Sequence, residues 1–194
     1  MCGACGGAGP DWSLPYVSGP RRRASIAGFL TAICRGAAVR AMRQGWTVRT
    51  STGGWSVPRT LTELVDAVAP RSGCSSWLEL QAVIRQRSRG SADAGEGTGR
   101  VPLGPSEDGA RLAALDATAE VVLPEGDLHL RIAAFLLGVR RFERGAVALE
   151  VCTGGAGTAS SFRLIGVDGQ LIGVAGVAGV SGGATTVARA ASAP

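Results

Sequence analysis

Two cysteines near the beginning of the chain carry the most specific chemical signal in the sequence. Cys2 and Cys5 are separated by Gly3 and Ala4, and Gly6 follows them. Two thiolates at this spacing can bind one metal ion from a tight turn, because glycine lets the backbone fold around the ion. A structural zinc ion needs further ligands to complete its tetrahedron, so this pair alone is half a site.

The other cysteines offer two interpretations. Within the first half of the chain Cys34 and Cys74 can complete the ligand set, which predicts zinc bound by Cys2, Cys5, Cys34 and Cys74. The alternative is that the first two belong to a disordered terminus, while Cys34, Cys74 and Cys152 are small buried apolar groups. An odd total of five cysteines without an export signal predicts reduced thiols rather than disulfides.

Arginine supplies every basic side chain apart from one histidine, and it is concentrated in the first half. Residues 1–89 contain twelve arginines against four acidic residues, whereas residues 90–194 contain eight arginines against eleven. Such a positive surface can displace counterions from the phosphates of a nucleic acid, or it can bind an acidic protein. The candidate residues for this binding are Arg21, Arg22, Arg23, Arg40, Arg43, Arg49, Arg85, Arg87 and Arg89.

Two tryptophans of the same half could stack on a base if they were exposed. The alternation of apolar residues instead predicts that Trp46 and Trp55 face the core of a small sheet, together with Val48 and Val57. The alternative to a nucleic-acid site is therefore an ordinary solvated surface, on which the last arginines only complement the end of a helix.

Signatures of catalysis are few. The chain contains no lysine, which excludes a Walker A loop, a Schiff-base lysine and a kinase lysine. The glycine-rich stretch 154–157 lies between predicted strands, so no helix N-terminus follows it to bind a phosphate. His129 lies near Asp127 and could titrate near neutral pH, but no nucleophile elbow accompanies it. We expect no catalytic residues, and an enzyme that uses a thiol or His129 is the alternative.

The composition is that of a folded chain with a core of ordinary size. Of 194 residues 45% are hydrophobic, and the mean hydropathy is +0.20. The apolar run 171–180 is too short to span a bilayer as a helix. No signal-peptide pattern opens the sequence. We therefore expect a cytoplasmic protein with no membrane partner.

Segments rich in glycine and small residues predict how the chain is divided. We expect a basic, cysteine-containing unit over 1–89, a flexible linker over 90–110, an acidic unit over 111–180 and a flexible tail over 181–194. Both units are predicted to belong to the α+β class.

The first unit is predicted as a helix, an antiparallel meander and two further helices. Ile26, Phe29, Leu30 and Ile33 share one face of a helix over about 24–35, because they recur at helical spacing. Alternating residues over 39–57 predict the meander. Two capping boxes predict the starts of the later helices, and they are formed by Thr60 with Glu63 and by Ser76 with Glu79.

The second unit is predicted as a strand, a helix and three antiparallel strands. The strand covers 117–123, and the helix follows Asp127. The buried side of this helix is predicted to carry Leu128, Ile132, Phe135, Leu136 and Val139. The dipeptide Asp168-Gly169 predicts a tight hairpin before the last strand.

These patterns favour a non-enzymatic binding or regulatory protein, whose first unit binds nucleic acid or an acidic partner and is closed by zinc. The alternative is an assembly adaptor that uses the C-terminal sheet. The stretch Leu171–Val180 is uncharged, and an uncharged edge strand is open to pairing with a second copy or with another chain.

Overall fold

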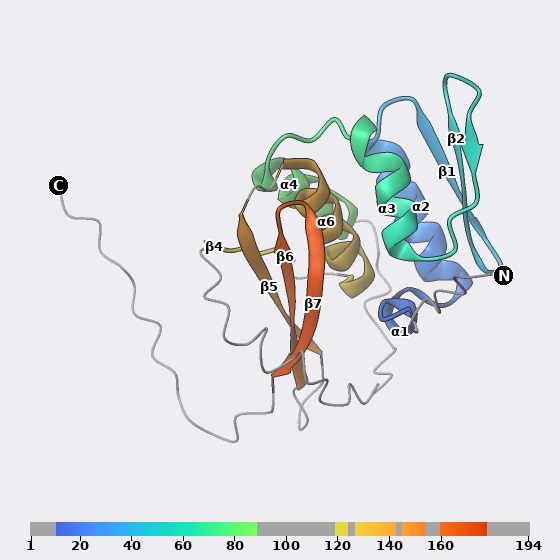
Figure 1. Ribbon diagram of the computed structural model, residues 1–194. Coiled ribbons are helices and arrows are strands. Elements are labelled where there is room, and N and C mark those ends of the chain that lie inside the picture. The colour runs from blue at the N-terminus through green and yellow to red at the C-terminus, as the bar shows by residue number, and fades with distance from the viewer. Residues whose placement is uncertain (1–10, 89–118, 124–126, 143–144, 154–159, 178–194) are drawn as a thin grey trace, which may run out of the picture.

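The computed structural model describes residues 11–88, 119–123, 127–142, 145–153 and 160–177, and it confirms an α+β fold (Figure 1). The first half contains α1 (Leu14–Val17), α2 (Pro20–Ile33), β1 (Ala37–Met42), β2 (Gly45–Thr50), β3 (Trp55–Ser56), α3 (Leu61–Val68), a 3-10 turn (Ala69–Arg71) and α4 (Trp77–Ser88). The second half contains β4 (Ala119–Glu120), α6 (Leu128–Phe142), β5 (Ala146–Thr153), β6 (Ser160–Val167) and β7 (Gln170–Val177).

The first sheet is an antiparallel meander in the order β1-β2-β3, and α2 covers its inner face. Helix α2 begins at Pro20, earlier than predicted, because proline suits the first helical position. The Thr31 hydroxyl of α2 accepts a hydrogen bond from the Val39 amide at 2.9 Å. The Trp46 indole is almost fully buried and donates to the Arg23 carbonyl at 3.1 Å. These bonds join α2 to both long strands of the sheet.

Helices α3 and α4 begin in the same way. The Thr60 hydroxyl accepts from the Glu63 amide at 3.1 Å, and the Ser76 hydroxyl accepts from the Glu79 amide at 3.4 Å. Each glutamate then reaches back to the amide of the residue before the cap, at 2.8 Å for Glu63 and 2.7 Å for Glu79. Both predicted helix starts are confirmed, and each cap satisfies backbone donors that the first turn leaves unpaired.

The second sheet has the order β4-β5-β6-β7 and is antiparallel apart from β4, which is parallel to β5. Helix α6 connects β4 to β5, and a helical crossover returns the chain in the same direction. The predicted hairpin is confirmed between β6 and β7. Asp168 and Gly169 have φ values of 47° and 79°, as a two-residue turn between strands requires.

Helix α6 lies in the middle of the molecule (Figure 1). It packs against the second sheet on one side and against α2, α3 and α4 on the other, while the first sheet lies beyond α2 and α3. The sequence predicted one buried side, but Ala133, Ala134 and Leu137 are buried as well. A helix between two layers buries residues on more than one face, which a one-sided pattern does not predict. None of the described helices is long and apolar enough to cross a membrane.

The buried side chains of both halves belong to one hydrophobic cluster. The division of the chain at a linker over 90–110 stays a prediction, because residues 89–118 lie outside the described residues. The predicted tail 181–194 lies outside them too. Wherever the boundary lies, the two halves share a core through α6.

A contact between Trp77 of α4 and Gly138 of α6 allows these helices to pack closely. A Cβ added at Gly138 would collide with the six-membered ring of Trp77. The same indole is stacked on Phe135, with ring centroids 5.9 Å apart, and meets Phe142 edge to face at 5.1 Å. The indole is therefore held on two sides and cannot easily move away from α6.

We predict that Gly138→Ala lowers the free energy of unfolding by about 1–3 kcal/mol, because the added methyl group overpacks this contact. Urea unfolding measures the change. Gly145→Ala is the matched control, since a Cβ there meets open space. The loss should shrink in a Trp77→Leu background. Equal unfolding midpoints for the two alanine variants would contradict the prediction, because they would show that a methyl group at position 138 does not strain the contact with Trp77.

Candidate nucleic-acid interface

The outer face of the first sheet is the surface that best matches the predicted binding site. Because side chains alternate along a strand, Val39 and Val48 face α2 while Arg40 and Arg49 face outward. In Figure 1 no described element covers this outer side of β1 and β2. We call the outward residues Ala38, Arg40, Met42, Thr47, Arg49, Trp55 and Val57 the outer sheet face.

Trp55 lies on this face, and its predicted place in the core is wrong. Its side chain is 74% exposed, whereas Trp46 is 1% exposed. The register pairs Trp55 with Arg49, so both side chains point to the same side of the sheet. Val57, two residues further along, is 41% exposed and follows the same alternation.

The turn between β2 and β3 causes this register. The Thr50 amide and hydroxyl donate to the Gly54 carbonyl, at 2.8 Å and 3.2 Å. The Gly53 amide donates to the Thr50 carbonyl at 3.0 Å. Gly53 has a φ of 87°, which glycine adopts without strain. This closed turn fixes Trp55 opposite Arg49.

The charge of the outer sheet face is positive because the sequence around it contains no acid. Between Trp12 and Thr62 the chain has eight arginines and neither Asp nor Glu. The acidic residues of the described first half are bound elsewhere: Asp11 accepts from Ser13, Glu63 and Glu79 cap helices, and Asp66 pairs with Arg140 at 2.6 Å. Arg40 and Arg49 are exposed, and no acid among the described residues pairs with them.

Among the three arginines at the start of α2, Arg23 contacts the hairpin that joins β1 to β2. The Arg23 guanidinium donates to the Arg43 carbonyl at 2.6 Å, which brings two of the predicted residues together at one end of the sheet. Arg22 turns the other way and donates to the Pro15 carbonyl of α1 at 3.1 Å. Arg21 is exposed on the first turn of α2.

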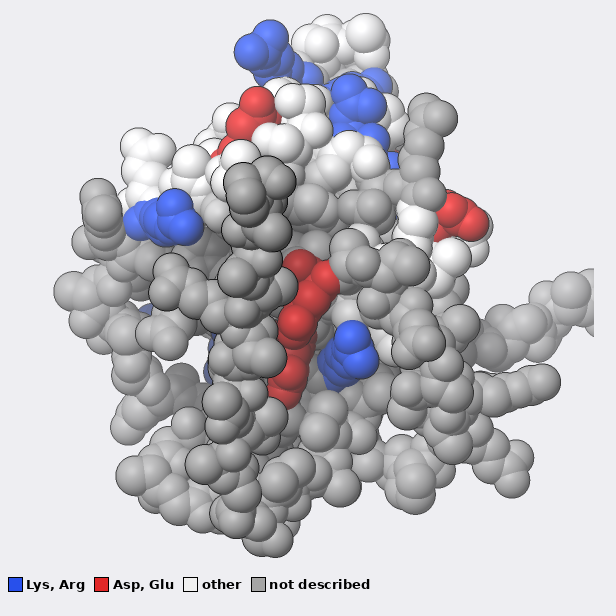
Figure 2. Space-filling view, turned by 90° about the vertical axis from the view of Figure 1, so that its left-hand side faces the viewer, with Lys and Arg blue, Asp and Glu red and all other residues white. Residues whose placement is uncertain are grey.

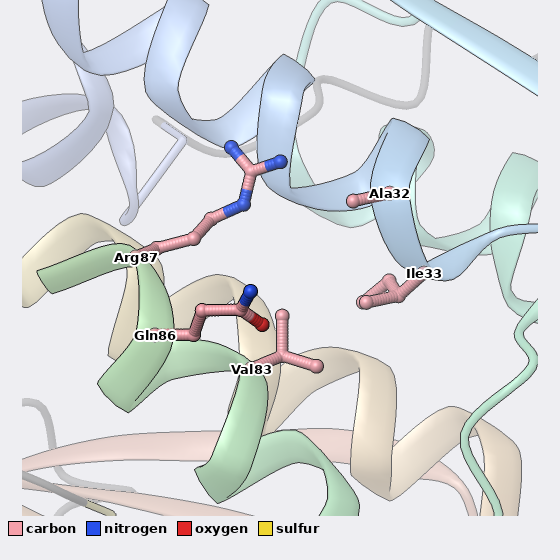
Figure 3. Close-up of a pocket in the computed structure, with 5 residues that line it drawn as sticks. All are labelled: Ala32, Ile33, Val83, Gln86 and Arg87. Carbon is pink, nitrogen blue, oxygen red and sulfur yellow. The ribbon is translucent and has the colours of Figure 1, made fainter. Parts of the chain in front are cut away.

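The arginines of α4 are separated from the outer sheet face by α2. Arg87 lines a cavity of about 390 Å³ between α2 and α4, together with Ala32, Ile33, Val83 and Gln86 (Figure 3). Arg85 is exposed on the same helix, and Arg89 lies outside the described residues. The predicted basic set therefore divides into a group at the sheet, Arg23, Arg40, Arg43 and Arg49, and a group on α4.

The side of the molecule that carries the second sheet has a different charge pattern. Figure 2 shows this side, and both acidic and basic side chains lie among its described atoms. Within the second sheet Glu150 and Arg163 face each other across β5 and β6. Opposite charges at such a position attract each other, which leaves less net charge available to a polyanion.

Two of the four predicted zinc ligands come together. Cys34 and Ser72 form an antiparallel bridge, and Cys74 follows Ser72 on the same side of the extended chain. Both thiols are buried, and burial raises the pKa of Cys34 to about 12, with a smaller contribution from the neighbouring Cys74. Cys2 and Cys5 lie outside the described residues, and the residues described show no cluster of three or more metal-binding side chains. The zinc site stays a prediction.

His129 lies in the first turn of α6. Its Nε2 atom is buried and has no hydrogen-bond partner among the residues described. Burial lowers its pKa, and the positive charge of Arg22 acts in the same direction, while Asp127 opposes them. The side chain is therefore held neutral, as suits a packed residue.

We predict that His129 makes the fold sensitive to acid. Its pKa in the folded state is below the ordinary value of 6.5, so the unfolded chain takes up a proton first as the pH falls. The stabilisation is complete above pH 6.5 and is lost as the pH falls from there through the folded pKa. Urea unfolding at neutral and acidic pH should show a smaller loss in His129→Gln than in the unchanged protein. Parallel pH profiles would contradict this.

Comparison with known proteins gives no matching family model, no matching curated protein and no matching solved structure.

Proposed function

We propose that this protein binds nucleic acid through the outer sheet face and the adjoining hairpin. The observation that carries the proposal is a solvent-exposed sheet face with Arg40 and Arg49 on neighbouring strands, in a stretch of chain without acidic residues. These two arginines are diagonal neighbours, with side chains that start about 7 Å apart. Two cations at this separation can each contact a different phosphate of one strand.

The hairpin extends this positive surface. Arg43 is exposed in the two-residue turn between β1 and β2, and Arg23 holds the hairpin backbone through its hydrogen bond to the Arg43 carbonyl. Arginine is suited to phosphate, because its planar guanidinium can donate two parallel hydrogen bonds. An acidic protein is the other partner that such a surface could bind. Nucleic acid is favoured because its phosphates provide a regular row of charge and its bases fit the apolar residues on the same face.

We predict that the double variant Arg40→Gln, Arg49→Gln weakens binding of nucleic acid and its dependence on salt. Each lost phosphate contact should lower the slope of log K against log salt by about 0.7 for a single strand or about 0.9 for a duplex. Fluorescence anisotropy of a labelled oligonucleotide, titrated at several salt concentrations, measures both effects.

Arg141→Gln is the matched control, because Arg141 is an exposed arginine at the end of α6 and does not belong to the outer sheet face. This variant should bind as the unchanged protein does. No binding at low salt, or an unchanged slope in the double variant, would contradict the proposal. Equally tight binding of polyglutamate would assign the surface to an acidic protein instead.

The edge of the second sheet favours a second function, assembly with another copy of this chain. β7 pairs with β6 on one side, and none of the described strands pairs with its other side. Its sequence, Gln170–Val177, carries no charge. Edge strands are usually protected by charge, proline or a bulge. β7 has one such irregularity, a register shift against β6 at Ile165/Gly166, but it carries no charge and no proline, which favours pairing with its own copy.

We predict that the full chain forms a dimer at high concentration through antiparallel pairing of β7 with its copy. Sedimentation across a range of concentrations measures the mass, and hydrogen exchange locates the contact. Amides of β7 should become protected as the dimer forms, while those of β1 should not. A monomer at every concentration, or protection outside β7, would overturn this prediction.

A further inference from the structure

The exposure of Trp55 is the starting point for a more specific conclusion about the ligand, which rests on the proposed function. A tryptophan offers more apolar surface than other residues, and most are largely buried. Trp55 is 74% exposed, although Trp46 of the neighbouring strand fills the core. Within the described part of the chain no ring or cation stacks on the Trp55 indole.

The backbone on both sides of Trp55 is held firmly even though its side chain is in solvent. On one side the Thr50 to Gly54 bonds close the turn, and on the other the Trp46 amide donates to the Pro58 carbonyl at 3.0 Å. Gly45 allows this second contact, because a Cβ there would lie 2.5 Å from the Pro58 carbonyl oxygen. The sheet therefore presents the indole from a fixed position, and binding need not first order the backbone.

The neighbours of Trp55 supply the other contacts that a nucleotide needs. Arg49 is directly opposite on β2, and Arg40 is diagonal to Arg49 on β1. Val57 and Met42 add exposed apolar surface, at 41% and 46% exposure. An aromatic face on the edge strand, with cations on the two strands beside it, combines base stacking with phosphate contacts, which is how proteins bind single strands.

We infer that the ligand is single-stranded nucleic acid and that one of its bases stacks on Trp55. In a duplex each base is already stacked on its neighbours, so its face is not available to a side chain on a flat sheet. In a single strand the faces are free, and every base has one, so this contact tolerates any sequence. Arg49 and Arg40 lie on the same side of Trp55, because the strand order is β1-β2-β3, and they then bind phosphates of the strand where it continues across the sheet.

The test compares three probes with the full chain: oligothymidylate, a hairpin duplex, and a strand of the same length without bases. Oligothymidylate should bind more tightly than the other two at the same salt concentration. Trp55→Ala should weaken the binding of oligothymidylate about 5- to 150-fold, which corresponds to the loss of about 1–3 kcal/mol of stacking free energy. It should leave the salt slope and the affinities for the other two probes unchanged, because Trp55 carries no charge.

Trp55→Phe is the conservative control, because phenylalanine keeps a face for stacking, and it should retain most of the affinity. Circular dichroism checks that each variant is folded, which an exposed position allows. Unchanged binding of oligothymidylate by Trp55→Ala, or a duplex bound as tightly as the single strand, would overturn this inference. In that case the Arg40 and Arg49 variants would still weaken binding, and the proposed function would stand. If no probe binds at low salt, both fail.

Discussion

Helix α6 is buried on every side, and the positions of the other layers follow from that burial. Nine of its fifteen residues are buried. Small residues such as Ala133, Ala134 and Gly138 let neighbouring elements approach, while Phe135 and Leu137 fill the space between them. The second sheet packs on one side of α6, whereas α2 and α3 pack on the other side. The first sheet, which lies beyond α2 and α3, is therefore an outermost layer. Its inner face is covered by α2, and its outer face is left for solvent or a ligand.

The charge of that outer layer depends on how the helices begin. Glu63 and Glu79 are needed as caps of α3 and α4, and Asp66 pairs with Arg140 of the second half. These acids lie on helices, away from the meander, and their charge is already engaged. The meander itself contains arginine without any acid. The acids of the described first half thus have partners on or near the helices, and the meander keeps an excess of positive charge.

Much of the fold could be predicted because its signals are local. The capping boxes, the Asp168-Gly169 hairpin and the order of elements each depend on residues close in sequence. The all-round burial of α6 could not be predicted from its one-sided pattern, because alanine and glycine fit both exposed and buried positions. The approach of Cys34 to Cys74 depends on the extended pairing of residue 34 with residue 72, which no local pattern encodes.

The outer sheet face shows how the length of one turn decides which side chains a strand exposes. The sequence predicts that Trp55 and Val57 share one face, but which face that is depends on the number of residues between β2 and β3. Thr50 and Gly54 close a three-residue loop, so Trp55 shares a face with Arg49. A loop longer by one residue would place the tryptophan opposite Val48, and a loop shorter by one would place it opposite Thr50; in both cases it would point toward the core side of the sheet. The signal that could have revealed the exposed indole is Gly53, which suits the left-handed position that ends such a loop. The length of this turn, rather than the hydrophobicity of the strand, therefore decides whether the indole supports the fold or is available to a ligand.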